Sequence, residues 1–143
     1  MARHELSKGE WLDKAEAYCA RAEHCAADVR RKLTEWCAPA EIAGFIEENL
    51  YKNDFLNDER FCRAYVHDKV EYQSWGRVKI EAGLRALQLP SSAIREAMET
   101  IEETTYLTNL RQLAASRKSD APEKRIRFLM QRGFTYEEIK KCT

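Results

Sequence analysis

Apolar residues recur every three or four positions along most of this chain, and that spacing is typical of amphipathic α-helices. Trp11, Ala15 and Tyr18 show it near the beginning, and later segments repeat it with short polar turns between them. No segment alternates apolar and polar residues over the length of a strand. Only five glycines and three prolines occur in 143 residues, which is too few for a turn-rich β architecture. The pattern predicts an all-α protein.

Several helix starts are marked by capping residues. Ser7 and Glu10 have the spacing of a capping box, in which each side chain accepts a hydrogen bond from the other's backbone N–H. Asn57 is a good N-cap for a helix expected from 58 to about 73. The apolar arc of that helix is unusually wide, because it contains Phe61, Cys62, Tyr65, Val66 and Tyr72. Such a helix should contact more than one neighbour.

Three stretches of the chain resemble one another. Residues 84–94 and 129–139 both begin with a leucine, have an apolar residue five positions on, and end at an isoleucine five positions later. Residues 33–42 repeat the pattern with Cys37 as the apolar residue and one residue fewer. Each stretch predicts a helix, a short turn and a second helix, preceded by a longer helix. We therefore expect nine helices in three tandem three-helix units, 1–56, 57–104 and 105–143, forming an elongated, curved helical array.

Composition narrows the class of protein. Hydrophobic residues make up 44% of the chain and charged residues 34%, as in globular proteins. The longest apolar runs are a few residues, too short to span a bilayer, and the opening MARHELSKGEW has no apolar core of a signal peptide. We expect a cytoplasmic monomer with no membrane association. Five cysteines without a CxxC pair or zinc-type spacing predict free, mostly buried thiols, no metal and no other cofactor.

The charges cancel overall but are segregated along the chain. Residues 111–132 hold seven bases against Asp120 and Glu123, a local balance of +5. Within the helix expected at 121–132, the predicted inner stripe consists of Pro122, Ile126, Leu129 and Met130. The predicted outer arc consists of Lys124, Arg125, Arg127, Phe128 and Arg132.

This outer arc has two interpretations. A basic face with an aromatic residue at its centre would suit contact with phosphates together with stacking on a base. Alternatively, Phe128 packs on the helix expected at 109–117 and the bases are only solvated. The sequence leaves both interpretations open.

Four further bases are candidates for contact with a partner: Arg60, Arg63, Arg77 and Lys79. For Arg60 and Arg63 the simpler interpretation is an ordinary solvated face. His67 lies on the same polar face as the first two, but no nucleophile or orienting residue can be assigned to it. We also find no glycine-rich phosphate loop, so the chain is not expected to be an enzyme. Trp11 and Trp36 are assigned to the core, and Trp75 to packing against the preceding helix.

Three segments together resemble those of a known family. Residues 55–66, FLNDERFCRAYV, resemble the hallmark segment of the RecX regulators, bacterial proteins that modulate the RecA recombinase. Residues 75–80 with Leu84 resemble the family's second motif, an aromatic-glycine step leading into a basic helix, and residues 23–33 resemble the first. The match covers about residues 12–142 in the right order. It departs from the family pattern at Cys25, Ser74 and Pro90, and the first repeat is one residue short.

The resemblance implies a non-enzymatic protein that binds the RecA filament, contacts the single-stranded DNA within it and restrains its activity in recombination, DNA repair and the SOS response. Whether the regulator inhibits or assists stays open, and direct binding to naked DNA is expected to be weak. The alternative is a helical DNA-binding module that acts without the recombinase. Such a module would bind naked DNA strongly and with a steep salt dependence, and a net charge of zero counts against it.

Overall fold

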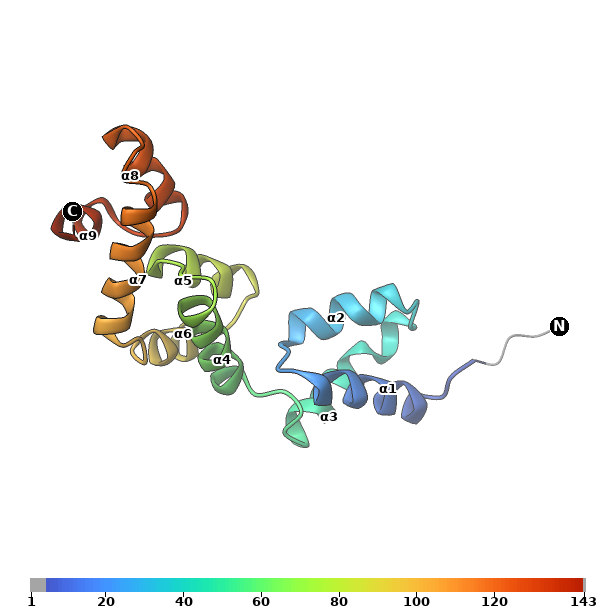
Figure 1. Ribbon diagram of the computed structural model, residues 1–143. Helices are drawn as coiled ribbons and strands as arrows, with labels where there is room; N and C mark the ends of the chain where they lie inside the picture. Colours follow the sequence, from blue (N-terminus) through green and yellow to red (C-terminus); the bar gives the residue numbers. More distant parts are fainter. Residues whose placement is uncertain (1–4, 143) are drawn as a thin grey trace. The chain divides into compact units, whose positions relative to one another are not determined.

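The computed structural model describes residues 5–142, and every regular element in that range is helical (Figure 1). In chain order these are α1 (Lys8–Arg21), α2 (Ala26–Glu35), the 3₁₀ turn Ala40–Ile42, α3 (Ala43–Lys52), α4 (Asp58–Glu71), α5 (Arg77–Ala86), α6 (Ser91–Met98), α7 (Glu103–Ser116), α8 (Pro122–Gln131) and α9 (Tyr136–Cys142). Helices α1, α4 and α7 each have 14 residues, and α2, α5 and α8 each have 10. The predicted all-α class of three-helix repeats is confirmed. None of the described helices is long and apolar enough to cross a membrane.

The chain divides into two compact units, Met1–Phe61 and Cys62–Thr143, which we call the N-terminal and C-terminal units. Helices α1 to α3 lie in the first, α5 to α9 lie in the second, and α4 begins in the first and ends in the second. The division into three units at 1–56, 57–104 and 105–143 stays a prediction. The ends of its outer units, residues 1–4 and 143, lie outside the described residues.

Two helix starts use the caps that the sequence predicts. The Ser7 hydroxyl accepts the Glu10 N–H at 3.1 Å, and the Glu10 carboxylate accepts the Ser7 N–H at 2.9 Å, which completes the capping box. The Asn57 side chain accepts the N–H of Arg60 at 2.8 Å at the start of α4. These bonds satisfy backbone donors that have no partner within the helix.

The second helix of every repeat ends in the same local structure. Positive φ angles follow α2, α5 and α8 at Cys37, Gln88 and Gly133. The next N–H along the chain then bonds back to the carbonyl of the repeat's leucine: Ala38 to Leu33 at 2.9 Å, Leu89 to Leu84 at 3.3 Å, and Phe134 to Leu129 at 3.2 Å. This is the Schellman arrangement of a helix C-terminus. All three leucines are buried, so the repeated turn is anchored in the core each time.

Cys37, which the repeat pattern aligns with Leu89 and Phe134, does not take their place in the structure. Cys37 is exposed, because it takes the left-handed position of the turn, and Ala38 is the residue that follows the pattern of Leu89 and Phe134. The first repeat is one residue shorter than the other two after this turn, where the 3₁₀ turn Ala40–Ile42 leads into α3.

The cysteines among the described residues are free thiols, and three of the five are buried: Cys19, Cys25 and Cys62. Burial raises the pKa of Cys19 to about 11, with the negative charges of Asp28 and Glu23 adding to the effect. The Cys19 thiol is therefore uncharged at neutral pH and acts as a small apolar side chain.

The N-terminal unit has a core formed by α1, α2 and α3. Its buried side chains are Trp11, Ala15, Cys19, Ala26, Val29, Leu33, Ile46, Leu50 and Leu56. Trp11 belongs to this core as predicted. Trp36 does not, because it is only half-buried and packs on the edge of the core with its ring centroid 6.5 Å from that of Trp11. The assignment of Trp36 to the core is therefore wrong.

In the C-terminal unit, α5 docks on the turn between α8 and α9 through backbone contacts. The Gly76 N–H donates to the carbonyl of Arg132 at 2.7 Å, and the Val78 N–H donates to that of Gly133 at 3.1 Å. A Cβ atom on Gly76 would lie 2.2 Å from the carbonyl carbon of Gly133, which is far inside van der Waals contact. The aromatic-glycine step at 75–76 therefore marks a position where only glycine permits this close approach.

Helix α4 is shorter than predicted and its apolar arc is narrower. It ends at Glu71, and Tyr72 lies beyond that end with 75% of its surface exposed, so the assignment of Tyr72 to the apolar face is wrong. The buried residues of α4 are Phe61, Cys62, Val66 and Val70. Tyr65 is half-buried, and its hydroxyl covers Gly83 of α5, where a Cβ atom would lie 2.1 Å from the hydroxyl oxygen.

Candidate functional site

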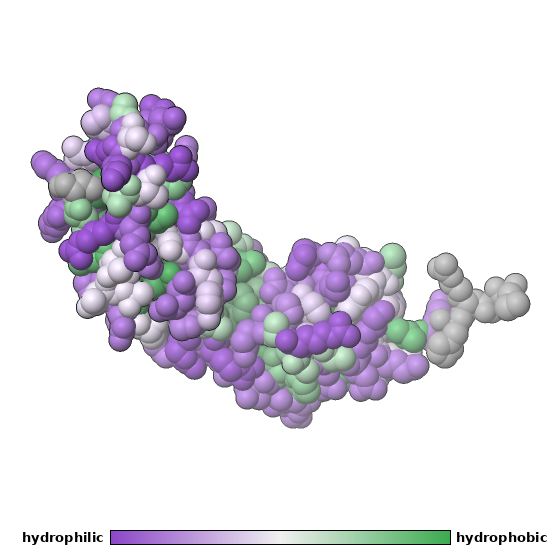
Figure 2. All heavy atoms as spheres, viewed as in Figure 1, coloured by the Kyte–Doolittle hydropathy of each residue, from purple (hydrophilic) through white to green (hydrophobic). Residues whose placement is uncertain are grey.

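Three bases of α8 are free to meet a partner, and we call Lys124, Arg125 and Arg127 the α8 basic face. Lys124 and Arg127 are exposed and Arg125 is half-buried. The Lys124 ammonium lies 4.0 Å from the Asp120 carboxylate, a surface pair of little strength, and neither arginine forms an ion pair with any described residue. Hydrophilic side chains cover most of the molecular face drawn in Figure 2. The role of these three bases in binding stays a prediction.

Phe128 does not lie at the centre of an exposed basic face. It is half-buried against the C-terminal core, and the guanidinium of Arg117 covers its ring at 4.0 Å from the centroid. For Phe128 the alternative interpretation, packing on the preceding helix, is the one the geometry supports. The predicted inner stripe is also partly wrong, because Met130 is 50% exposed and Pro122 is exposed, while Ile126 and Leu129 do face the core.

Arg132 lies apart from the α8 basic face. It is the C-cap of α8 and is half-buried, and its guanidinium donates a hydrogen bond to the backbone carbonyl of Gln73 in the turn between α4 and α5. Its Nε is buried and has no hydrogen-bond partner among the described residues. Arg132 therefore braces the junction at Gly76 and Gly133, rather than extending the basic face.

Arg60 connects the start of α4 to the N-terminal unit. Its Nε donates to the Glu23 carboxylate at 2.5 Å, and its two terminal nitrogens donate to the side chain and the backbone carbonyl of Asp54 at 3.1 and 3.0 Å. The guanidinium is half-buried and its donors are engaged. Arg60 therefore has a structural role, and a partner would have to break these hydrogen bonds to bind its guanidinium.

Arg63 is more accessible than Arg60. Its ion pair to Glu96 of α6, at 3.0 Å, joins side chains that are 46% and 58% exposed. Pairs of that kind contribute about 0–1 kcal/mol, so a partner could replace Glu96 at little cost. His67 lies on the same helix and contacts Tyr72 edge-on, with the ring centroids 6.2 Å apart.

Arg77 is the centre of a polar cluster within the C-terminal unit. Its guanidinium donates to Glu103 at 2.5 Å and to Glu138 at 3.2 Å, and it covers the ring of Tyr106 at 4.0 Å from the centroid. The Tyr106 hydroxyl accepts the Arg77 N–H at 3.0 Å and donates to Glu138 at 3.2 Å. Burial, with the charge of Glu138, raises the pKa of Tyr106 above its ordinary value. The cluster connects α5 to α7 and α9.

Lys79 and Trp75 form a smaller cationic-aromatic group. The Lys79 ammonium lies 4.2 Å from the centroid of the Trp75 ring, and the ammonium of Lys69, on the preceding helix α4, lies 4.7 Å from it. Trp75 is half-buried, as expected for packing against that helix. Of the nine predicted site residues, only the three of the α8 basic face lie together as accessible bases, while Arg77 and Lys79 of α5 belong to two different groups.

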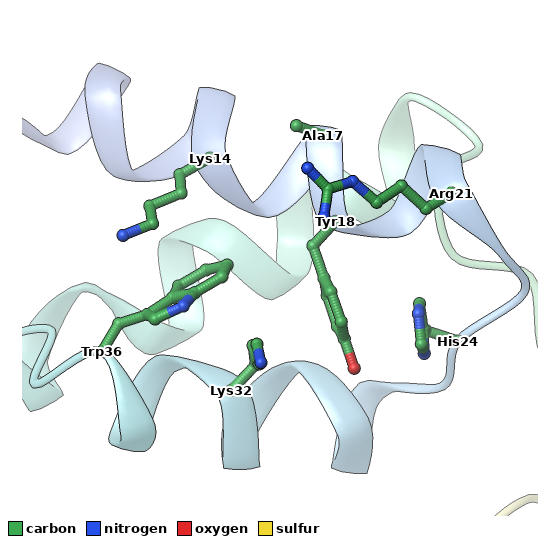
Figure 3. Close-up of a pocket in the computed structure, with 7 residues that line it drawn as sticks. All are labelled: Lys14, Ala17, Tyr18, Arg21, His24, Lys32 and Trp36. Atoms are coloured by element: carbon green, nitrogen blue, oxygen red, sulfur yellow. The ribbon is translucent and has the colours of Figure 1, made fainter.

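A pocket that sequence reasoning missed lies between α1 and α2. It has a volume of about 420 Å³ and is lined by Lys14, Ala17, Tyr18, Arg21, His24, Lys32 and Trp36 (Figure 3). We call it the α1–α2 pocket. In the view of Figure 3 the Tyr18 side chain reaches from α1 toward α2, and Trp36 approaches from the end of α2. The signal in the sequence was the spacing of Lys14, Tyr18 and Arg21, which places all three on one side of α1.

Rings and cations alternate around this pocket. The Tyr18 ring stacks on His24 with centroids 3.9 Å apart and meets Trp36 edge-on at 6.0 Å. The Lys14 ammonium lies 4.5 Å from the centroid of the Trp36 ring, and that of Lys32 lies 5.8 Å from it. The exposed guanidinium of Arg21 forms no ion pair with any described residue. Such cation–π contacts hold the lysines near the rings without neutralising them.

Comparison with known proteins relates this chain to one protein family. A family profile described as the second three-helix domain of RecX matches residues 57–98. The curated "Regulatory protein RecX" of Leptothrix cholodnii is 31% identical over 134 residues, which are 89% of this chain and 83% of that protein.

Solved structures agree on the fold. A crystal structure described as regulatory protein RecX superposes with a TM-score of 0.79 and 20% identity, over 99% of this chain and 81% of the other. The crystal structure of RecX from Lactobacillus salivarius superposes with a TM-score of 0.78 and 20% identity, over 94% of this chain and 93% of the other. At that level of identity the likeness shows the three-helix-repeat fold.

Proposed function

The chain belongs to the RecX family of regulatory proteins, and on that premise we propose that it binds the RecA recombinase filament on DNA and restrains the activity of the filament in recombination and DNA repair. Family membership is the observation that carries this proposal. The relatives are named as regulators and not as enzymes, in keeping with a protein that acts by binding.

The arrangement of charges supports a protein partner together with DNA. The chain has no net charge, so it lacks the excess of bases that strong binding to naked DNA alone would require. Arg60 and Arg77 are engaged with carboxylates of their own units, and this leaves the α8 basic face and Arg63 as the accessible cations among the predicted site residues. A few accessible bases are enough to orient a regulator on an acidic or phosphate-lined surface.

ATP hydrolysis by RecA on single-stranded DNA tests the proposal directly. Titration with this protein, at amounts below one per recombinase subunit, is expected to lower the rate of hydrolysis and of strand exchange, because a bound regulator would restrain filament growth. Binding to naked duplex DNA should stay weak at physiological salt in the same preparation. A rise in the rate would mean that the protein assists the recombinase. Nanomolar duplex binding with no effect on hydrolysis would instead support the DNA-binding module.

The α8 basic face is tested by reversing its three charges together. Replacing Lys124, Arg125 and Arg127 by glutamate changes the local charge by six units, from +5 to about −1 for residues 111–132, so attraction to phosphate or to an acidic protein surface should be lost. We expect inhibition of RecA to weaken about tenfold or more. Ile126 and Leu129 still face the core in this variant, so helical content by circular dichroism should not change.

A matched control separates this face from net charge. Arg95, Arg111 and Lys118 are exposed, lie in the same unit and form no ion pair with a described residue. Changing these three to glutamate shifts the net charge equally and should leave inhibition intact. If the α8 triple variant lowers the slope of log affinity against log salt by about one unit per lost contact, the α8 basic face contacts phosphates. If both folded variants inhibit as well as the wild-type protein, the α8 basic face is only solvated surface.

A further inference from the structure

The charges that line the α1–α2 pocket favour an anion. Lys14, Arg21 and Lys32 supply three positive charges, and no carboxylate belongs to the part of its lining that the structure describes. Two acids pair with residues of the lining: Asp28 lies 3.2 Å from the His24 ring nitrogen and Glu35 lies 3.2 Å from the Lys32 ammonium. The surplus of positive charge therefore comes mainly from Lys14 and Arg21, which have no acidic partner among the described residues.

The same pocket also offers aromatic surface to a flat ring. Tyr18, His24 and Trp36 all line it, and Tyr18 and Trp36 are only half-buried although both could have packed inside a larger core. Beside its contact with the core, the Trp36 ring is covered by the flexible side chains of Lys14 and Lys32. A ligand ring can displace such a side chain, and the displaced ammonium then remains close enough to contact an anionic part of the same ligand.

An acidic peptide would use the cations of the pocket but not its aromatic rings. Carboxylates would satisfy Lys14 and Arg21, but they need no aromatic surface. A nucleobase joined to phosphate uses both parts, because bases stack on aromatic side chains while phosphates meet Lys and Arg. The volume of about 420 Å³ lies within the range of about 300–1,000 Å³ that is usual for small-ligand sites.

We propose that the α1–α2 pocket binds a nucleotide of single-stranded DNA, with the base stacked on Trp36 and the flanking phosphates held by Lys14 and Arg21. These two bases are seven residues apart on α1, or about 10 Å along the helix axis at ~1.5 Å per residue. Two cations at separate positions of the pocket can contact two different phosphates of a strand, whereas a free mononucleotide offers only one. The proposal deepens the proposed function, because it assigns a contact of the regulator with the DNA strand to the N-terminal unit.

The base contact is tested with a fluorescently labelled oligothymidylate and an abasic oligomer of equal length, both at low salt. The wild-type protein should bind the oligothymidylate about tenfold more tightly than the abasic strand, as expected for stacking of at least one base. Trp36→Leu should abolish this difference while keeping its affinity for the abasic strand. Trp75→Leu removes the other half-buried, lysine-covered tryptophan and should leave the difference unchanged.

The phosphate contacts are tested through the salt dependence of binding. Lys14→Gln combined with Arg21→Gln should reduce the slope of log affinity against log salt by about 1.4, since each lost phosphate contact on a single strand contributes about 0.7. The matched control is Lys52→Gln with Arg95→Gln, which removes two exposed bases outside the pocket that form no ion pair with a described residue, and it should leave the slope unchanged.

Four results would overturn the proposal. The first is equal affinity of the wild-type protein for the oligothymidylate and the abasic strand. The second is a folded Trp36→Leu protein that binds the oligothymidylate as tightly as the wild-type protein does. The third is equally tight binding of a polyglutamate peptide, which would assign the pocket to an acidic protein segment. Tighter binding of free thymidine monophosphate than of the strand would assign it to a free nucleotide. None of these assays contains the recombinase, so their failure would leave the regulation of RecA untouched.

Discussion

Gly76→Ala is expected to lower the free energy of unfolding of the C-terminal unit by about 3 kcal/mol. The added methyl carbon would lie 2.2 Å from the carbonyl carbon of Gly133 and 2.3 Å from its oxygen. Both atoms belong to the backbone, so no side chain can rotate away, and α5 must move off the α8–α9 turn. Overpacking that shifts the backbone costs about 1–3 kcal/mol, and this site combines the shift with loss of two hydrogen bonds. Urea unfolding followed by circular dichroism measures the change.

Gly44→Ala is the control for this substitution and should act in the opposite direction. No atom lies within 4 Å of the position that a Cβ atom on Gly44 would take. Gly44 is exposed in α3, where alanine is favoured over glycine by about 0.5–1 kcal/mol, so the variant should be slightly more stable than the wild-type protein. Unchanged stability of Gly76→Ala would contradict the backbone docking of α5.

Tyr106→Ala should be at least as damaging, with a loss of about 3–5 kcal/mol. Tyr106 is 1% exposed, and its ring is packed between Phe134 and the guanidinium of Arg77, so truncation leaves a large cavity. Tyr106→Phe keeps the ring and removes the hydroxyl that bonds the Arg77 N–H and Glu138. Its expected cost is about 1–3 kcal/mol, because those two groups lose a partner. Equal stability of the phenylalanine variant and the wild-type protein would show that the hydroxyl contributes nothing.

The raised pKa of Tyr106 adds a pH dependence with a definite sign. Burial raises the pKa of this phenol in the folded state above the value of about 10 in the unfolded chain. The contribution to stability is complete below pH ~10 and is lost as the pH rises above it, since the unfolded state then loses its proton first. The stability difference between the wild-type protein and Tyr106→Phe should therefore shrink in alkaline solution. A constant difference between pH 8 and 11 would contradict this assignment.

The polar cluster around Arg77 explains why a basic motif need not be a binding surface. Arg77 belongs to the basic helix of the family's second motif, yet its guanidinium meets Glu103 and Glu138 and its N–H meets Tyr106. A partner would have to replace three contacts inside the C-terminal unit. We therefore expect Arg77 substitutions to lower stability and binding together, whereas Arg63 and Arg127 can change binding alone.

Features that depend on neighbours in the chain could be predicted from the sequence. Ser7 and Glu10, three residues apart, form the predicted capping box, and Asn57 caps α4. The leucines at 33, 84 and 129 are buried at equivalent turns because the Schellman bond spans only five residues. Where one residue was missing, the sequence could not show whether Cys37 or Ala38 turned inward, because the shorter connection allows either alignment.

Which face of a helix is buried was harder to predict near the edges of an apolar arc. Met130 and Phe128 lie on opposite borders of the apolar stripe of α8, and periodicity alone favoured Met130 as the inner one. The structure buries part of Phe128 instead, because Arg117 and the α7 core lie on that side. The width and direction of a buried arc depend on the neighbouring helix, and helical spacing does not contain that information.

The sequence by itself determined the all-α class, the helix starts and the threefold repeat, since each of these rests on interactions within a few residues. Only the tertiary structure decided which bases are available. Arg77 meets Glu138 across 61 residues and Arg132 meets Gln73 across 59, and no local pattern predicts such partners. The α1–α2 pocket likewise required two helices to be placed side by side before Lys14, Tyr18 and Trp36 could be seen as neighbours. Contacts between distant segments depend on packing in three dimensions. Packing therefore decides which charged side chains find a partner and which stay exposed.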